Sequence, residues 1–191
     1  VVHLTDRLMD RQLDHVGATY LKNKIERLGI RVHLSRQTAA LTGNGKVEGV
    51  RFRDGVEMPA DMVVIAAGIR PNTWLASAAG LEVNRGIVVD DYLRTSDPDI
   101  YAVGECTEHN GETFGLVAPL LAQGKVLAAA ITGNETPGFS ASTPAAKLKI
   151  AGVDVFSAGM TDDTEGCDSV RYEDPSLGIY KKAVLKDNKM V

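Results

Sequence analysis

The chain has 191 residues, of which 44% are hydrophobic and 24% charged, and its formal net charge at pH 7 is -4. This length and composition are typical of a globular protein with one or two cores, and nothing in them suggests a nucleic acid as partner. The sequence has no run of 18 apolar residues and no charged-then-apolar leader, so we expect no membrane span, no signal peptide and a cytoplasmic location.

Residues 1–61 predict a strand, a helix and then hairpin strands. The chain starts in an apolar strand, and Asp10 is expected to cap a helix that Gly29 ends. The expected apolar face of this helix consists of Leu13, Val16, Tyr20, Leu21, Ile25 and Leu28. Strands are predicted at 30–34, at 47–52 and near Val56. Asn44-Gly45 between them predicts a hairpin turn rather than a dinucleotide-binding glycine loop.

Two further regions follow. Residues 62–142 predict strands at 62–66, 87–89 and 100–103, and a helix at about 119–131 that is nearly all apolar and is therefore expected to be buried. A segment rich in Pro, Gly and Ser at 136–144 predicts a linker. Residues 147–191 show strand alternation.

The two cysteines, Cys106 and Cys167, predict no metal centre. They are too far apart for a CxxC redox pair and too few for a zinc site or an iron–sulfur cluster. His109 lies three residues after Cys106, which leaves a nucleophile or metal role as an alternative that we do not favour. Cys167 lies in an acidic segment and is expected in a surface loop, so we predict a reduced compartment and no metal ligand.

Two apolar strands end on glycine. One leads into Gly68 and the other, through the sequence TSDPDIYAV, into Gly104 and Glu105. In open α/β sheets, ligands lie outside the carboxyl ends of the strands. A glycine lets the backbone approach a ligand closely, and the Glu105 carboxylate can accept hydrogen bonds from sugar or ribityl hydroxyls. We therefore expect a cofactor at these strand ends.

These motifs resemble a known family. The sequences AGIRP at 67–71 and TSDPDIYAVGE at 95–105 are similar to the two later motifs of the FAD-dependent pyridine nucleotide-disulphide oxidoreductases. The continuations CTEH at 106–109 and FGLVAP at 114–119 look like the branch that includes the large subunit of NAD(P)H nitrite reductase. Many relatives carry Asp where this chain has Glu105, and a Glu there is itself similar to that branch.

The resemblance implies an α/β fold made of partial, doubly wound, Rossmann-like domains. Residues 1–61 would be the back half of an NAD(P)H-binding domain, and 62–142 the C-terminal part of an FAD-binding domain. Residues 143–191 would begin a smaller α+β C-terminal interface domain. No G-x-G-x-x-G loop follows a strand and opens a helix, so the parts that seat each pyrophosphate would lie outside this chain.

The resemblance also implies roles for segments of the FAD part. Leu116, Val117 and Ala118 would cross the pyrimidine edge of the flavin, where the helix dipole favours the anionic reduced form. Gly68, Ile69, Arg70 and Pro71 would lie where the nicotinamide and flavin domains meet. We expect no side chain to act as a catalytic acid or base.

His3 and Arg7 are candidate nucleotide-binding residues. His3 lies where nucleotide-binding domains usually carry an acid for the adenine ribose. An imidazole there would not repel a 2′-phosphate, and Arg7 could pair with one, which favours NADPH or dual use over strict NADH. An ordinary surface His beside a solvated Arg is the alternative.

Three functions follow from these patterns. The first is a fragment of the flavin reductase module of a nitrite reductase used in nitrate assimilation, with FAD and NAD(P)H as cofactors. Siroheme and iron–sulfur clusters would lie in missing parts of the chain. The second is a stand-alone ferredoxin or rubredoxin reductase or an NADH oxidase, and the third a non-enzymatic nucleotide- or partner-binding module.

The expected partners are the remainder of the chain, its redox centres and, through unpaired sheet edges, a second copy. The isolated fragment is expected to be inactive.

Overall fold

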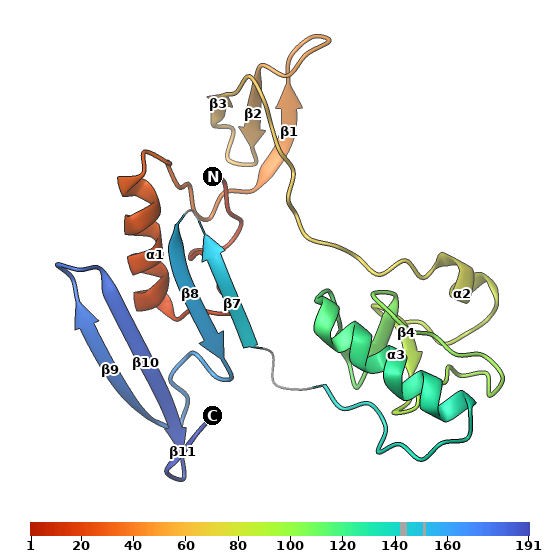
Figure 1. Cartoon of the computed structure of the whole chain (residues 1–191). Helices are drawn as coiled ribbons and strands as arrows, with labels where there is room; N and C mark the ends of the chain where they lie inside the picture. The colour runs from red at the N-terminus through yellow and green to blue at the C-terminus, as the bar shows by residue number, and fades with distance from the viewer. Residues whose placement is uncertain (142–144, 151) are drawn as a thin grey trace. The chain divides into compact units, whose positions relative to one another are not determined.

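The computed structural model describes residues 1–141, 145–150 and 152–191 and divides into two compact units (Figure 1). Unit 1 combines Val1–Val64 with Thr143–Val191, and unit 2 is Ile65–Ser142. The boundary predicted between 142 and 143 lies outside the described residues. Helices and strands alternate along the described chain, which confirms the α/β class.

Unit 1 begins with a β-α-β arrangement around helix α1 (His15–Arg27). Val2 pairs in parallel with His33 across this helix, although residues 30–34 form only that isolated bridge and not the predicted strand. The cap is Asp14, not Asp10, because residues 9–13 are taken up by a turn in which the Met9 carbonyl accepts the N–H of Leu13. Asp14 Oδ1 accepts the N–H of Gly17 at 2.8 Å, a normal N-cap bond.

The apolar face predicted for α1 is mostly correct. Leu21 and Ile25 are buried in a core with Leu8, Val32 and Val155, and Leu13 packs against it. The prediction is wrong for Leu28, which is the C-cap residue and is 57% exposed. At the cap, the helix has already ended and its apolar stripe no longer faces the core.

The predicted hairpin is present. Strands β1 (Thr38–Thr42), β2 (Gly49–Phe52) and β3 (Glu57–Pro59) form an antiparallel sheet in that order. Thr42 pairs with Gly49, so the loop containing Asn44-Gly45 connects two paired strands. The glycines of this segment therefore serve a turn, as predicted, and open no helix.

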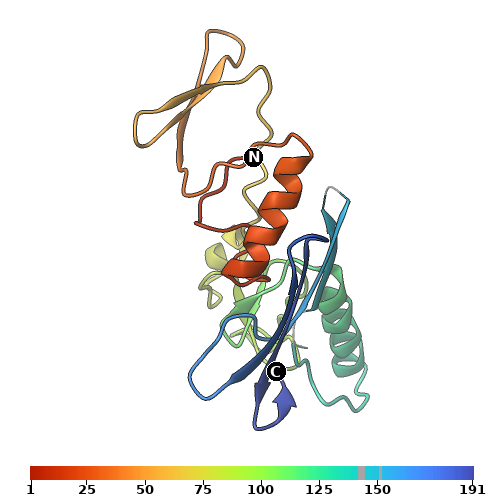
Figure 2. The same cartoon turned by 90° about the vertical axis from the view of Figure 1, so that its left-hand side faces the viewer.

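The described C-terminal part of unit 1, residues 145–150 and 152–191, contains strands joined by loops, as the alternation predicts. Strands β7 (Ala145–Ile150) and β8 (Val153–Ala158) pair antiparallel. Strands β9 (Asp168–Asp174), β10 (Ile179–Lys186) and β11 (Lys189–Met190) form a second sheet with β10 in the middle. Helix α1 runs beside β10 and also contacts β8 (Figure 2).

A polar cluster joins α1 to β10. Tyr180 Oη donates to Asp14 Oδ2 at 2.5 Å, and Lys182 Nζ lies 3.2 Å from the same oxygen. Lys182 Nζ also lies 2.9 Å from Asp163 and donates to the Thr161 carbonyl. Only 7% of the Lys182 side chain and 9% of the Asp14 side chain are exposed, so these opposite charges neutralise each other away from water.

Unit 2 contains helix α2 (Trp74–Ala78), which was not predicted, and a sheet of β4 (Ile87–Val89), β5 (Thr107–His109) and β6 (Glu112–Thr113). Strands β4 and β5 are parallel, and β5 and β6 antiparallel. The strand at 87–89 is confirmed. Val89, Leu93, Phe114 and Phe139 form the core of this unit.

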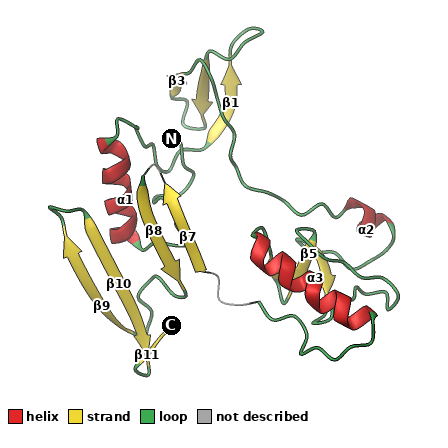
Figure 3. Cartoon of the chain, viewed as in Figure 1, coloured by secondary structure: helices red, strands yellow, loops and turns green. Residues whose placement is uncertain are grey.

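Two predicted strands are not formed. Residues 60–73 contain neither helix nor strand (Figure 3), and Val64 and Ile65 are 81% and 76% exposed. Of the predicted strand at 100–103, only Tyr101 makes a bridge, to Arg94. A strand needs hydrogen-bonding neighbours, and no described residue pairs with 62–66.

Helix α3 (Val117–Ile131) is present but is not buried as predicted. Among its residues only Gln123 is buried, while Leu121 is 63% exposed and Ile131 61%. Leu120, Val126 and Leu127 pack against the unit 2 core. The helix is apolar on all sides, but the described chain covers only the side that faces this core.

Candidate functional site

The site is built at the ends of two backbone segments in unit 2. Gly68 has φ 82° and Gly104 has φ 106°, a region that favours glycine. A Cβ at Gly104 would meet no atom within 4 Å, so backbone conformation and not crowding requires this glycine. Glu105 follows it and is exposed, with its carboxylate available to a ligand.

The N-terminus of α3 is the second component. Its N-cap, Leu116, has extended backbone angles and an apolar side chain that makes no capping bond, and its first turn contains no acid. The amides of Leu116, Val117 and Ala118 therefore have no partner within the helix, and Pro119 has no N–H to add. These amides and the helix dipole favour an anionic group or an oxygen acceptor in front of them.

Contacts within unit 2 bring the predicted segments together. A Cβ on Gly115 would lie 3.1 Å from Ile69 Cδ1, so the 68–71 segment lies against the loop that enters α3. The N–H of Gly104 donates to Gln123 Oε1 at 2.9 Å, which ties the Gly104 segment to α3 itself. Gly68, Ile69 and Arg70 are exposed and Pro71 is half-buried.

Strand β5, which begins two residues after Glu105, carries three buried polar residues, of which the sequence analysis considered only His109. Thr107 is fully buried, Glu108 is 4% exposed and His109 is 3% exposed. The signal was the run of polar residues between two apolar segments, which has no helical or strand periodicity of its own. Its members are buried because each one finds a hydrogen-bond partner in unit 2.

Glu108 holds the turn before β4. Its Oε2 accepts the N–H of Arg85 at 2.8 Å and that of Gly86 at 3.0 Å, and its Oε1 accepts from Asn84 Nδ2 at 2.9 Å. The N–H of Gly86, together with the bonds from Asn84 and Arg85, holds the pKa of the Glu108 carboxyl below its ordinary value in spite of burial. This carboxylate therefore has a structural role, holding the turn at residues 84–86.

A second carboxyl with a lowered pKa is Asp14 in unit 1. Burial alone would raise the pKa of Asp14, but the hydrogen bonds from Tyr180, the N–H of Gly17 and Lys182 outweigh burial and lower it. A carboxyl with a depressed folded-state pKa adds stability above its unfolded-state pKa, and that stability is lost as the pH falls through the folded-state value.

We therefore expect the free energy of unfolding to stay nearly constant from pH 7 to pH 5 and to fall below about pH 4, the ordinary carboxyl range. Urea denaturation followed by circular dichroism at several pH values measures this. The variant Glu108→Gln, which cannot titrate, should show a shallower fall. A fall of equal steepness in both proteins would show that Glu108 does not contribute.

His109 is not paired with Cys106. Its Nε2 lies 2.8 Å from Asp91 Oδ1, and its ring makes an edge contact with Phe139 at a centroid distance of 5.1 Å. The Cys106 Sγ instead faces the Val103 carbonyl at 3.6 Å. Within residues 1–141, 145–150 and 152–191, no group of three or more His, Cys, Asp or Glu is arranged for a metal ion.

His3 and Arg7 lie in unit 1. Arg7 Nη2 pairs with Asp162 Oδ2 at 2.9 Å and also donates to the Asp10 carbonyl. Its side chain is 16% exposed. The Nε2 of His3 and the Nε of Arg7 are buried and have no protein hydrogen-bond partner. Arg7 is thus engaged by a carboxylate in this structure.

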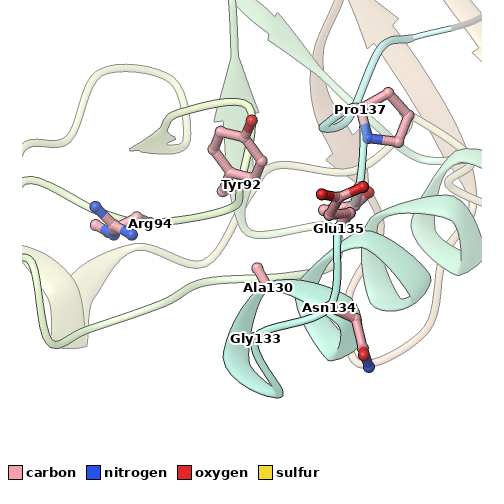
Figure 4. Close-up of a pocket in the computed structure, with 8 residues that line it drawn as sticks. Tyr92, Arg94, Ala130, Gly133, Asn134, Glu135 and Pro137 are labelled. Atoms are coloured by element: carbon pink, nitrogen blue, oxygen red, sulfur yellow. The ribbon is translucent and has the colours of Figure 1, made fainter.

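A hollow lies elsewhere in unit 2, at the C-terminal end of α3 (Figure 4). It has a volume of about 810 Å³ and is lined by Tyr92, Arg94, Ala130 and residues 133–137. None of the residues predicted to bind a cofactor lines it, so the candidate site is the exposed edge at Gly104 and the start of α3.

No helix within the described ranges is long and apolar enough to cross a membrane.

Comparison with protein families gives two matches. Residues 1–126 match the family described as pyridine nucleotide-disulphide oxidoreductase, and residues 144–191 match the C-terminal domain of rubredoxin NAD+ reductase. The first match covers all candidate residues in both units. It agrees with the resemblance carried by the motifs at 67–71 and 95–105.

Curated relatives are larger redox proteins. The chain is 48% identical over its whole length to a nitrite reductase [NAD(P)H] of Bacillus subtilis and covers 24% of that protein. It is 45% identical to an assimilatory nitrate reductase electron transfer subunit of the same organism, covering 25% of it. It is 43% identical to the nitrite reductase (NADH) large subunit of Escherichia coli, covering 23%. The chain thus spans about a quarter of the length of these relatives.

Solved structures agree on the fold. A ferredoxin reductase from Rhodopseudomonas palustris superposes with a TM-score of 0.83 at 29% identity, covering all of this chain and 48% of that one. An FAD-dependent pyridine nucleotide-disulphide oxidoreductase from Desulfovibrio vulgaris gives 0.80 at 30% identity, covering 97% of this chain and 49% of that one. The partial Rossmann-like fold class is confirmed.

Proposed function

Because the chain belongs to the pyridine nucleotide-disulphide oxidoreductase family, we propose that it is part of the flavin reductase module of an NAD(P)H-dependent nitrite reductase. The observation that supports the proposal is that both predicted segments are tied to α3: Gly104, next to Glu105, bonds to Gln123, and Ile69 lies against Gly115 just before the uncapped start of this helix. The names of the relatives in Bacillus subtilis and Escherichia coli support the choice of nitrite reductase.

The residues present fit a flavin. The open space beside Gly104 leaves room for a ligand, and Glu105 can accept hydrogen bonds from ribityl hydroxyls. The amides of Leu116, Val117 and Ala118 would face the polar edge of the ring, where the helix dipole favours negative charge. Bound FAD would supply the redox chemistry, accepting a hydride from NAD(P)H and passing electrons on to iron–sulfur and siroheme centres elsewhere in the protein.

The remaining segment would position the nicotinamide side. Gly68, Ile69, Arg70 and Pro71 follow the apolar run of 62–66, and Ile69 lies against Gly115 at the entry to α3. An apolar side chain there would exclude water and orient a bound nicotinamide, and Arg70 would offer a cation to the phosphates of the dinucleotide. No side chain in this arrangement needs to transfer a proton.

His3 and Arg7 would bind the adenine end of the dinucleotide, with NADPH or dual use favoured. His3 Nε2 and Arg7 Nε have no protein hydrogen-bond partner, but both atoms are buried, so a ligand would reach them only if the side chains around them moved. A 2′-phosphate would compete with Asp162 for the Arg7 guanidinium. The domain assignment that goes with this proposal is 1–61 for the NAD(P)H part, 62–142 for the FAD part and 143–191 for the C-terminal part.

The test is the flavin content of the full-length protein that carries this chain. We expect stoichiometric FAD, and we expect Glu105→Ala to raise the FAD dissociation constant by about tenfold, because one charge-assisted hydrogen bond is worth about 1.5 kcal/mol. Glu112→Ala, an exposed acid on β6, is the matched control and should bind FAD normally. A protein without flavin would contradict the proposal.

A second function is favoured by one observation, the match of residues 144–191 to the C-terminal domain of rubredoxin NAD+ reductase. It is a stand-alone flavin reductase that serves ferredoxin, rubredoxin or oxygen. The absorption spectrum of the full-length protein separates the two: flavin with siroheme bands indicates nitrite reductase, and flavin alone indicates the stand-alone enzyme. With the first proposal we also propose a cytoplasmic location, electron transfer to redox centres of the same chain, and self-association.

A further inference from the structure

Gln123 is an unexpected residue in its helix. It is the only buried residue of α3 and is fully buried, although the helix otherwise consists largely of Ala, Leu and Val. A primary amide placed out of water costs free energy unless its donors and acceptor are satisfied. A Leu at this position would fill similar space, so the helix itself does not explain the amide.

The hydrogen bonds of Gln123 hold the backbone of the Gly104 loop. Its Oε1 accepts the N–H of Gly104 at 2.9 Å, and its Nε2 donates to Thr107 Oγ1 at 3.1 Å. The Thr107 hydroxyl in turn donates to the Gly104 carbonyl at 2.8 Å. Both polar groups of Gly104 are therefore held in one ring of hydrogen bonds, and all of its members lie in unit 2.

This ring connects the two components of the candidate site. Gln123 lies in the second turn of α3, close behind the free amides of Leu116, Val117 and Ala118. Gly104, with φ 106°, directly precedes Glu105. Fixing the Gly104 peptide to α3 therefore fixes where the Glu105 backbone leaves the loop relative to the helix N-terminus.

We propose that Gln123 is a positioning residue for the flavin. Its amide, together with Thr107, holds the Gly104 backbone at a fixed place relative to α3, so that the Glu105 carboxylate and the α3 amides can bind the same ligand. This inference rests on the proposed function. Gln123 touches no reacting group and acts only through Gly104. Its loss is expected to weaken flavin binding more than it weakens the fold.

The experiment uses the full-length protein, stripped of flavin and titrated with FAD by fluorescence quenching. Gln123→Leu keeps the volume but leaves the Gly104 N–H without an acceptor, and we expect the FAD dissociation constant to rise by about tenfold. Lys125→Leu, on the exposed side of the same helix, should change it less than twofold. The dissociation constant for NAD(P)H should stay unchanged, because no member of the ring bonds to His3, Arg7 or the 68–71 segment.

Val89→Ala controls for general loss of stability. Val89 belongs to the unit 2 core and makes no bond to Gly104. Hydrogen exchange of peptides covering 100–109, measured without flavin, should become faster in Gln123→Leu than in Val89→Ala. If Gln123→Leu does not fold, Thr107→Val, which removes the hydroxyl of the ring at nearly constant volume, takes its place with the same expectation.

The outcomes separate the two proposals. If the unaltered protein binds FAD and Gln123→Leu or Thr107→Val binds it equally well, the positioning role is wrong and the flavin site stands. The role is also wrong if Val89→Ala weakens FAD binding as much as the ring variants do. If the unaltered protein binds no FAD, the proposed function itself fails.

Discussion

Replacing Lys182 by methionine is expected to lower the free energy of unfolding of unit 1 by about 3 kcal/mol, the order of the loss seen when one partner of a buried ion pair is removed. Lys182 Nζ contacts Asp14, Asp163 and the Thr161 carbonyl, and its side chain is 7% exposed. Without the ammonium, the buried Asp14 carboxylate keeps only the bonds from Tyr180 and the Gly17 N–H.

Urea denaturation at pH 7, followed by circular dichroism, measures this loss. The matched control is Lys181→Met, because the neighbouring Lys181 on β10 points to the other face of the strand and is exposed, and it should change stability by less than about 0.5 kcal/mol. The double variant Lys182→Met with Asp14→Asn should lose less than the sum of the single variants, since no charge is then left unpaired. Equal losses from Lys181→Met and Lys182→Met would contradict the buried pair.

The second large effect is expected for Glu108→Ala in unit 2. Removing the carboxylate leaves the buried N–H of Gly86 and the part-buried N–H of Arg85 without an acceptor, and an unsatisfied buried group costs about 1–3 kcal/mol. We expect a loss of about 2–4 kcal/mol, because the Gly86 N–H bears the full cost and water can replace part of the bond to Arg85. The rate of hydrogen exchange in peptides covering 81–95 should rise in proportion to the equilibrium constant that this loss of stability changes.

The variant Glu108→Gln separates the loss of the charge from the loss of the hydrogen bonds. The amide oxygen can take the place of Oε2 toward Arg85 and Gly86, and Asn84 can turn its own oxygen toward the new NH₂ group. We expect a loss of only about 1 kcal/mol, for the missing charge. Glu112→Ala on β6 serves as the control, because its side chain is exposed. A Glu108→Ala protein as stable as this control would show that the turn at 84–86 does not need the carboxylate.

The Asp14 cluster and the Glu108 bonds both join residues that are far apart in the sequence, which is why no local pattern predicted them. Asp14 lies 166 residues before Tyr180, and Glu108 lies 22 residues after Gly86. A polar residue in a sequence window predicts exposure, and only the partner that the fold brings to it makes burial possible.

The sequence by itself determined the α/β class, the presence of a helix before Gly29 although not its cap, the hairpin at Asn44-Gly45 and the family. It also pointed to Gly104, Glu105 and the start of α3, because a glycine after an apolar run and an uncapped apolar helix are local features. Only the tertiary structure decided which apolar segments are covered. Residues 62–66 and most of α3 are apolar and still exposed, because burial depends on what packs against a segment and not on its own composition. Only the tertiary structure, too, brought Gln123 to Gly104 and Lys182 to Asp14, because those bonds join elements that the chain connects through long loops and strands.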